Sequence, residues 1–184
     1  MVGIGGCGVN TVTLMTSSQA HFTYIGIDRD WNSLRSSVVD LAILLDQGLA
    51  FPNIIPLLTK SDIVAIAAGM GGETGAEMAP VLARAARAHG ATVIGVVSMP
   101  FRFEGYLRRR YAVTRARKLQ EITHQLKVVE LQDLVEQVPR STSMKEAFRR
   151  SCRWLAGELH SDIEDVLQNS LPPSEAPFSG KRCA

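Results

Sequence analysis

Two glycine-rich segments of this 184-residue chain could hold phosphate groups. Gly3-Ile-Gly-Gly-Cys-Gly8 follows a short apolar stretch, and the run from Gly69 to Gly75 follows a longer one. Glycine lets backbone N–H groups approach a phosphate closely, and a helix that begins after the loop adds partial positive charge. The sequence therefore predicts anion-binding chemistry at both loops, and two such loops could wrap one triphosphate.

The first loop also satisfies the dinucleotide-binding pattern Gly-x-Gly-x-x-Gly, and Asp28 follows it by about twenty residues. This pattern alone favours a Rossmann-like dehydrogenase, or simply a tight turn from a strand into a helix. A dehydrogenase needs only the first loop and leaves the second unexplained. We therefore regard the dehydrogenase as the weaker hypothesis.

The elements that must position the loops alternate between strands and helices. Asp62–Ala68 and Ala91–Ser98 are continuous apolar runs, as expected of parallel strands buried on both faces. Ser143-Met-Lys-Glu146 is a capping box that opens a long amphipathic helix. The pattern predicts a three-layer α/β/α sandwich with a mainly parallel sheet. Further strands are expected over 1–4, 22–27 and 127–131, and further helices over 9–17, 31–37, 77–89 and 104–126, whereas 38–58 has no clear assignment.

Length and composition indicate one globular domain, residues 1–170, followed by a tail, 171–184, with the composition of a disordered end. The net charge of +2 does not by itself indicate a nucleic-acid or membrane partner, and the basic run from Arg102 to Lys118 is interpreted as a solvated helix face. The three cysteines lack metal-site spacing. With no apparent signal peptide or membrane span, we expect a cytoplasmic protein.

Three segments resemble the FtsZ/tubulin family, and together they cover most of the chain. Gly3-Ile-Gly-Gly-Cys-Gly-Val-Asn10 is similar to that family's first nucleotide loop. Ile63 to Gly75, followed by Ala79-Pro-Val81, resembles a strand, the tubulin signature loop and the next helix. Gly95 to Gly105 is similar to the strand and turn that lead to a ribose-binding glutamate. The resemblance implies the nucleotide-binding domain of an FtsZ-like protein.

The resemblance implies positions for the residues around the phosphates. Gly5, Gly6 and Asn10 would lie under the nucleotide, with Asn10 facing the guanine base. The implied ligand is GTP or GDP, accompanied by Mg²⁺. The residues that would cradle its β- and γ-phosphates are Gly71, Gly72, Thr74 and Gly75.

Three further positions match residues that the family uses on the nucleoside side. Glu104 and Arg108 lie four apart, on one face of the expected helix, and match a pair that touches ribose and phosphate. Phe148 matches an aromatic residue that packs against the base. Judged by its helical position alone, Phe148 would be an ordinary core residue.

The sequence departs from the family at the phosphate loop. Glu73, Ala76 and Glu77 replace a glycine, a hydroxyl residue and a second glycine. A carboxylate at about 5 Å from a phosphate charge costs roughly 3 kcal/mol at an effective dielectric constant of 20. Either both glutamates point inward and weaken triphosphate binding, or Glu73 faces solvent and Glu77 stabilises the helix N-terminus.

Two other departures concern the base and the hydrolysis. Cys152 stands where the family carries an acid or amide that reads guanine, and a thiol is a poor partner for the guanine N–H groups. No counterpart of the family's catalytic acidic loop follows the long helix. We therefore expect a guanine-nucleotide-binding, FtsZ-like cell division protein with weak or no GTP hydrolysis by itself, and no catalytic residue is assigned. The alternative is a non-catalytic interaction protein of the same fold that caps or regulates filaments by binding full-length FtsZ or itself.

Overall fold

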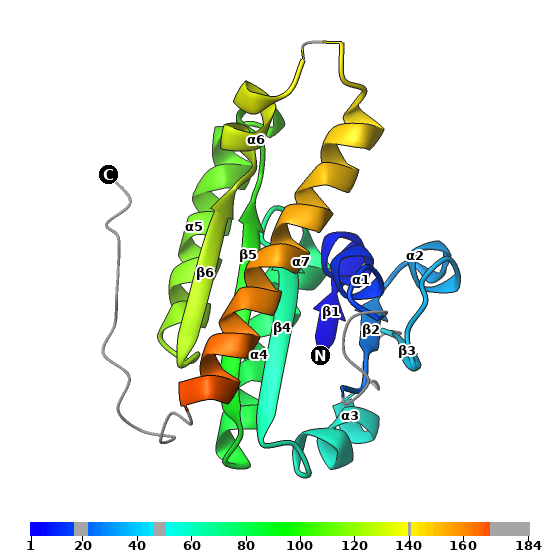
Figure 1. The fold of residues 1–184 in the computed structure, drawn as a ribbon, viewed down its shortest axis with the longest axis vertical. Helices are drawn as coiled ribbons and strands as arrows, with labels where there is room; N and C mark the ends of the chain where they lie inside the picture. The colour runs from blue at the N-terminus through cyan, green and yellow to red at the C-terminus, as the bar shows by residue number, and fades with distance from the viewer. Residues whose placement is uncertain (17–21, 46–50, 140, 170–184) are drawn as a thin grey trace.

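A computed structural model describes residues 1–16, 22–45, 51–139 and 141–169. Six parallel strands form one sheet in the order β3-β2-β1-β4-β5-β6 (Figure 1). This confirms the predicted mainly parallel α/β architecture, and all carboxyl ends of the strands therefore lie at one edge of the sheet. The strands are β1 (Val2–Ile4), β2 (Ile25–Asp28), β3 (Leu41–Leu44), β4 (Ile63–Gly69), β5 (Thr92–Met99) and β6 (Gln125–Glu130).

Helices cover both faces of the sheet, as a three-layer sandwich requires (Figure 1). One core cluster joins the sheet to α3, α4 and α5, and a second joins it to α1, α6 and α7. The α-helices are α1 (Gly5–Thr13), α2 (Trp31–Arg35), α3 (Phe51–Leu58), α4 (Glu73–Ala88), α5 (Tyr106–Gln120), α6 (Leu131–Gln137) and α7 (Met144–Asn169), and η1 (Arg102–Glu104) is a short 3₁₀ turn. No helix within the described residues is long and apolar enough to cross a membrane.

The structure corrects several predicted boundaries near the glycine loops. Helix α1 begins at Gly5 rather than at residue 9, and α4 begins at Glu73 rather than at residue 77. The first glycine loop is thus largely the first turn of α1, and the second runs from the end of β4 into the first turn of α4. The helix expected over 104–126 is divided at Gly105, whose φ of +101° is accessible to glycine but strained for other residues.

The unassigned segment 38–58 contains the edge strand β3 and the helix α3, which keeps Pro56 inside it. The Ser143 cap of α7 is confirmed, because the Glu146 backbone N–H donates to Ser143 Oγ at 3.2 Å. The Glu146 carboxylate accepts a hydrogen bond from Arg150 Nε at 3.1 Å. The apolar face predicted for α7 is buried from Cys152 onward, but Phe148 is 44% exposed and does not belong to the core. Ser17 and the tail after Asn169 lie outside the described residues.

An ionic cluster joins α7 to the edge strand β6. Lys127 Nζ pairs with Glu158, and it lies 3.5 Å from Asp162 Oδ1. The hydrogen bond from Lys127 lowers the pKa of the Glu158 carboxyl. Burial raises the pKa of Asp162, whose side chain is only 3% exposed. The Lys127 ammonium group therefore lies beside two carboxyl groups, one whose pKa is lowered (Glu158) and one whose pKa is raised (Asp162).

Replacing Lys127 with methionine is expected to lower the free energy of unfolding by about 1–2 kcal/mol at neutral pH, since a buried carboxylate loses its partner. The stabilisation from Glu158 is present above its unfolded pKa and disappears as acid protonates it, because its folded pKa is lowered. The cost of ionised Asp162 also disappears in acid, because its folded pKa is raised. The deficit of Lys127→Met should therefore shrink as the pH falls.

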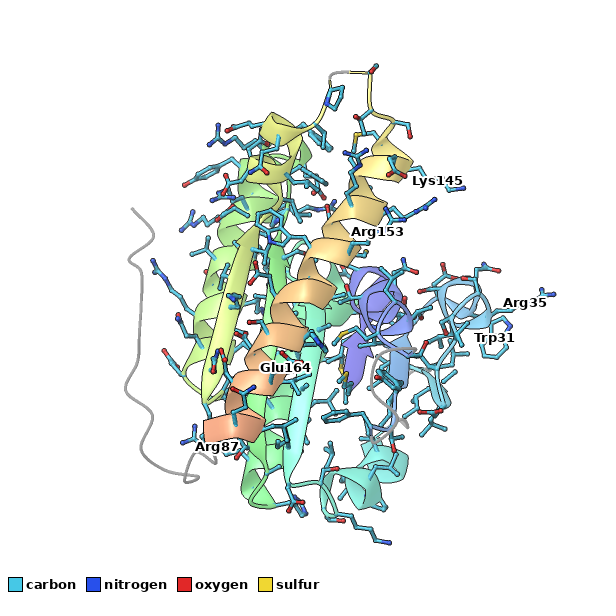
Figure 2. The ribbon with its side chains drawn as sticks, in the orientation of Figure 1. Trp31, Arg35, Arg87, Lys145, Arg153 and Glu164 are labelled. Atoms are coloured by element: carbon cyan, nitrogen blue, oxygen red, sulfur yellow. The ribbon has the colours of Figure 1, made fainter. Side chains whose placement is uncertain are left out.

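Thermal unfolding at neutral and acidic pH measures this deficit. Lys145→Met is the matched control, because Lys145 is an exposed cation at the start of the same helix (Figure 2). A deficit of equal size at both pH values would show that Lys127 contributes by packing and not by charge.

Candidate functional site

The N-termini of α1 and α4 lie side by side at the carboxyl edge of the sheet. Strand β1 runs directly into α1, and β4 leads through Met70–Gly72 into α4. These strands are hydrogen-bonded neighbours, with Ile4 in register with Ala68. Gly5 has φ +70°, and a Cβ built on it would lie 3.3 Å from the backbone nitrogen of Gly75. The two predicted loops therefore form one site.

The first backbone N–H groups of both helices are available to an anion. Ile4 and Gly72 occupy the N-cap positions, and neither provides a side-chain cap within the described part of the chain. Uncapped N–H groups need a partner, and the aligned peptide dipoles favour a negative one. A Cβ built on Gly72 would meet nothing within 4 Å, and one on Gly6 would meet nothing closer than 3.7 Å. The site is therefore an open cradle, which fits a phosphate group.

Other glycines serve the packing beneath this cradle. A Cβ on Gly8 would lie 2.1 Å from the carbonyl oxygen of Ala67, and one on Gly75 would lie 2.5 Å from that of Gly69. A Cβ on Gly71 would lie 2.9 Å from Cβ of Pro100, which follows β5. The absence of a side chain at these glycines lets α1 and α4 pack closely on β4, and lets the loop before α4 pack on the turn after β5. This packing fixes the positions of the two helix N-termini.

The two glutamates of the second loop share one arginine. Arg29 Nη1 lies 3.4 Å from Glu73 Oε2, and Arg29 Nη2 lies 3.2 Å from Glu77 Oε2. Glu73 is 80% exposed and lies in the first turn of α4, whereas Glu77 is 40% exposed. The sequence left open whether both acids point inward or serve solvent and helix separately. In the structure both carboxylates are directed to Arg29, beside the cradle.

Arg29 is a site residue that the sequence analysis missed. It follows Asp28 at the carboxyl end of β2, which pairs with β1 and therefore ends at the same sheet edge as the two loops. Asp28 holds the turn, since its Oδ1 accepts the Arg29 backbone N–H at 2.7 Å. The sequence does contain a signal for this role, because an arginine at this sheet edge is a natural ion-pair partner for the two acids of the second loop.

Glu104 and Arg108, which the sequence predicted at the ribose and phosphate, form an ion pair with each other. Arg108 Nη1 donates to Glu104 Oε2 at 2.8 Å, and the Phe101 backbone N–H donates to Glu104 Oε1 at 2.8 Å. Glu104 belongs to η1 and Arg108 to the first turn of α5, so the pair spans two elements rather than one helix. The Glu104 side chain is 16% exposed, and each of its two carboxylate oxygens accepts one of these hydrogen bonds.

Phe148 takes part in an aromatic cluster. Its ring meets the buried Phe101 edge to face at 5.2 Å, and Phe103 stacks on the same ring at 5.1 Å. Phe103 and Phe148 remain 63% and 44% exposed, which leaves apolar surface for a planar ligand. Asn10 is exposed on α1.

Cys152 is directed into the protein and not toward a ligand. Its Sγ is buried and donates to the carbonyl oxygen of Cys7 at 3.8 Å, one helical turn after Phe148. The neighbouring Cys7 side chain and burial together raise the pKa of the Cys152 thiol, so it stays protonated. This contact fastens α7 to the first loop. Among the described residues, no group of three or more His, Cys, Asp or Glu side chains could hold a metal ion.

Comparisons with known proteins agree with this geometry. Residues 52–139 match the model of the Tubulin/FtsZ family, GTPase domain. The cell division protein FtsZ of Magnetospirillum gryphiswaldense is 32% identical over 94% of this chain and 34% of its own length, and that of Bartonella bacilliformis is 34% identical over 92% and 32%. An empty FtsZ dimer from M. jannaschii superimposes with a TM-score of 0.81 at 28% identity, over 89% of this chain and 53% of that one. The fold of CetZ1 from Haloferax volcanii, solved as a GDP-bound monomer, is similar at a TM-score of 0.69 and 18% identity, over 95% and 61%.

The parallel sheet with two glycine loops at its carboxyl edge thus defines a GTPase-type domain of the tubulin class. The chain belongs to the Tubulin/FtsZ family, and its two FtsZ relatives named above are cell division proteins. It spans about a third of the length of these relatives. The family assignment replaces the dehydrogenase hypothesis.

Proposed function

We propose that this chain binds a guanine nucleotide with its phosphates between the N-termini of α1 and α4, and that it hydrolyses GTP weakly or not at all by itself. The observation that carries the proposal is the pair of adjacent, uncapped helix N-termini with open glycine faces. Membership of the Tubulin/FtsZ family, GTPase domain, supports the choice of nucleotide. In this proposal the phosphates are held by Gly5, Gly6, Gly71, Gly72, Thr74 and Gly75.

The nucleoside would extend from the cradle toward the aromatic cluster. Phe148 would pack against the base, Asn10 would face it, and Glu104 with Arg108 would contact ribose and phosphate. Glu104 is suited to this role because its two hydrogen bonds hold the carboxylate in one orientation. Buried Cys152 offers no group to the base, so we expect discrimination between guanine and other bases to be loose.

The acids at the cradle are expected to weaken GTP binding, and thereby to slow turnover. Their ion pairs with Arg29 are largely exposed, so they offset only part of the repulsion between carboxylate and phosphate. Mg²⁺ would have to take most of its ligands from phosphate oxygens and water, as is common for this ion. Among the described residues, no cluster of acidic side chains could supply these Mg²⁺ ligands in their place.

Isothermal titration calorimetry with GTP, GDP and ATP, each with and without Mg²⁺, tests the proposal. We expect binding heat with GTP and GDP, and little phosphate release with GTP. The difference in affinity between these nucleotides and ATP should be smaller than at a site that selects guanine. Absence of both heat and a thermal shift with all three nucleotides would exclude the proposed site.

The position of the acids also favours a second candidate, an interaction protein that has kept the fold and lost turnover. Such a protein would bind one end of a filament of full-length FtsZ, or a second copy of itself. Substoichiometric addition to an FtsZ assembly reaction should then shorten the filaments. Unchanged filament length would count against this candidate.

Arg29→Ala is expected to weaken nucleotide binding by about tenfold, because two carboxylates are released next to the phosphates. The effect should nearly vanish in the Glu73→Gln/Glu77→Gln background, where no charge is left to be held. Titration calorimetry of the four proteins gives this double-mutant cycle. A loss of equal size in both backgrounds would mean that Arg29 contacts the nucleotide directly, and Arg35→Ala controls for the general loss of one positive charge.

A further inference from the structure

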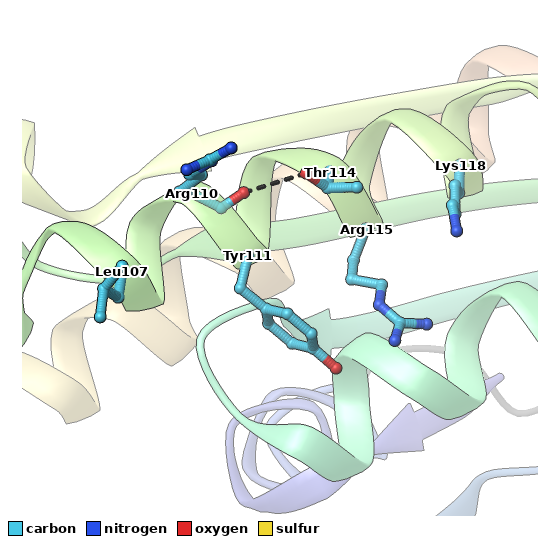
Figure 3. Close-up of a pocket in the computed structure, with 6 residues that line it drawn as sticks. All are labelled: Leu107, Arg110, Tyr111, Thr114, Arg115 and Lys118. Atoms are coloured by element: carbon cyan, nitrogen blue, oxygen red, sulfur yellow. Dashed lines mark hydrogen bonds between the residues drawn. The ribbon is translucent and has the colours of Figure 1, made fainter.

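One face of α5 forms a shallow groove outside the proposed nucleotide site. The groove has a volume of about 380 Å³, and the residues that line it recur at intervals of three and four along the helix, so they share one face (Figure 3). The face includes no residue assigned to the nucleotide. Its members are Leu107, Arg110, Tyr111, Thr114, Arg115 and Lys118.

The groove is cationic and lacks acids. Arg110, Arg115 and Lys118 form no ion pair with any residue in the described ranges, and no lining residue carries a negative charge. Their neighbours differ, because Arg108 pairs with Glu104 and Arg109 with Glu130. Three cations therefore remain to attract an anionic partner.

Apolar surface interrupts the positive charge. Leu107 is 78% exposed at one end of the groove, and Tyr111 is half-buried between the cations. The Arg115 guanidinium lies 4.9 Å from the centre of the Tyr111 ring, as in a cation–π contact (Figure 3). A partner that matches this face must offer both negative charge and an apolar group.

The groove lies on a fixed support. Ala112, Ala116 and Leu119, on the opposite side of α5, are buried in the core. Arg87 of α4 donates to the carbonyl oxygen of Ile122 at 2.8 Å, just beyond the end of α5. The lining side chains thus belong to a helix that is held against the sheet and against α4, so little ordering is needed before a partner binds.

We propose that this face of α5 binds an acidic peptide segment of a partner protein, with carboxylates on Arg110, Arg115 and Lys118 and an apolar side chain beside Leu107 and Tyr111. Clusters of basic side chains recognise acidic segments by charge-assisted hydrogen bonds. A membrane surface would need a broader apolar face, and a duplex would need a longer basic surface than three cations on about two helical turns. A groove that holds one apolar side chain fits a peptide best.

Fluorescence polarisation with a fluorescein-labelled peptide of alternating glutamate and leucine tests the proposal. We expect saturable binding that weakens with added salt. The variant Arg110→Ala/Arg115→Ala/Lys118→Ala should weaken binding by about tenfold or more, and Leu107→Ser should weaken it by a smaller factor. The matched control, Arg35→Ala/Lys60→Ala/Lys145→Ala, removes as many exposed positive charges elsewhere and should leave binding unchanged. Figure 2 shows Arg35 and Lys145 away from α5.

Equal binding by the two triple variants would overturn the proposal, and so would the absence of binding by the unmodified chain. Binding of single-stranded DNA or phosphatidylserine vesicles in place of the peptide would also overturn it, in favour of another class of partner. Nucleotide titration of the same variants separates the two sites, because the α5 substitutions should leave nucleotide affinity unchanged.

Discussion

Replacing Gly72 with valine is expected to weaken nucleotide binding by roughly a hundredfold or more while the protein stays folded. Gly72 has φ −97°, which other residues adopt readily, and a Cβ built on it meets nothing within 4 Å, so we expect valine to be accommodated. Its side chain would occupy the space between the helix N-termini and displace the phosphate from at least two N–H groups. Two lost charge-assisted hydrogen bonds correspond to an affinity loss of roughly a hundredfold or more.

Calorimetry with GTP, together with thermal unfolding, measures both parts of this prediction. The substitution should cost at most about 1 kcal/mol of stability, because glycine is a better N-cap than valine. Gly157→Val is the matched control, since Gly157 is exposed on α7 and a Cβ there also meets nothing within 4 Å. Unchanged nucleotide affinity in Gly72→Val would show that the phosphates do not occupy the cradle.

Gly8→Ala is expected to cost about 3 kcal/mol or more of folding stability. The added methyl group would lie 2.1 Å from the carbonyl oxygen of Ala67, a backbone atom of the central strand β4. Relief requires that α1 move away from the sheet, which breaks packing in a core where overpacking typically costs 1–3 kcal/mol and occasionally more. Chemical denaturation gives the free energy directly.

Gly6→Ala is the control for this prediction. It places the same methyl group two residues earlier in the same helix, where the nearest atom is Ser33 Oγ at 3.7 Å. Alanine is a better helix former than glycine, so Gly6→Ala should raise stability by about 0.5–1 kcal/mol. If both substitutions changed stability alike, close packing of α1 on β4 would not be the reason for Gly8.

Much of the fold could be predicted from local sequence patterns. The buried runs at 62–68 and 91–98 became β4 and β5, because a strand covered on both faces must be apolar throughout. The glycine loops were also predictable, because close packing requires glycine at particular positions. Gly8 and Gly75 lie so close to backbone atoms that no side chain fits there. The start of α7 followed from Ser143 and Glu146, whose capping interaction is local.

What the sequence left open depends on contacts between distant segments. The directions of Glu73 and Glu77 are set by Arg29, which lies more than forty residues away along the chain. The resemblance places Cys152 at the position of a base-reading residue, but in the structure its hydrogen-bond partner is Cys7. The start of α4 was placed too late because the glycines hid a helical first turn, for which glycine has a poor intrinsic preference.

A crystal structure of the protein grown with GTP tests the central claim most directly. We predict density for the phosphates between Gly5–Gly6 and Gly71–Gly75, with the base beside Phe148 and with Glu73 and Glu77 still paired to Arg29. Nucleotide bound elsewhere, or an empty cradle at saturating GTP with the glutamates turned into it, would contradict the account.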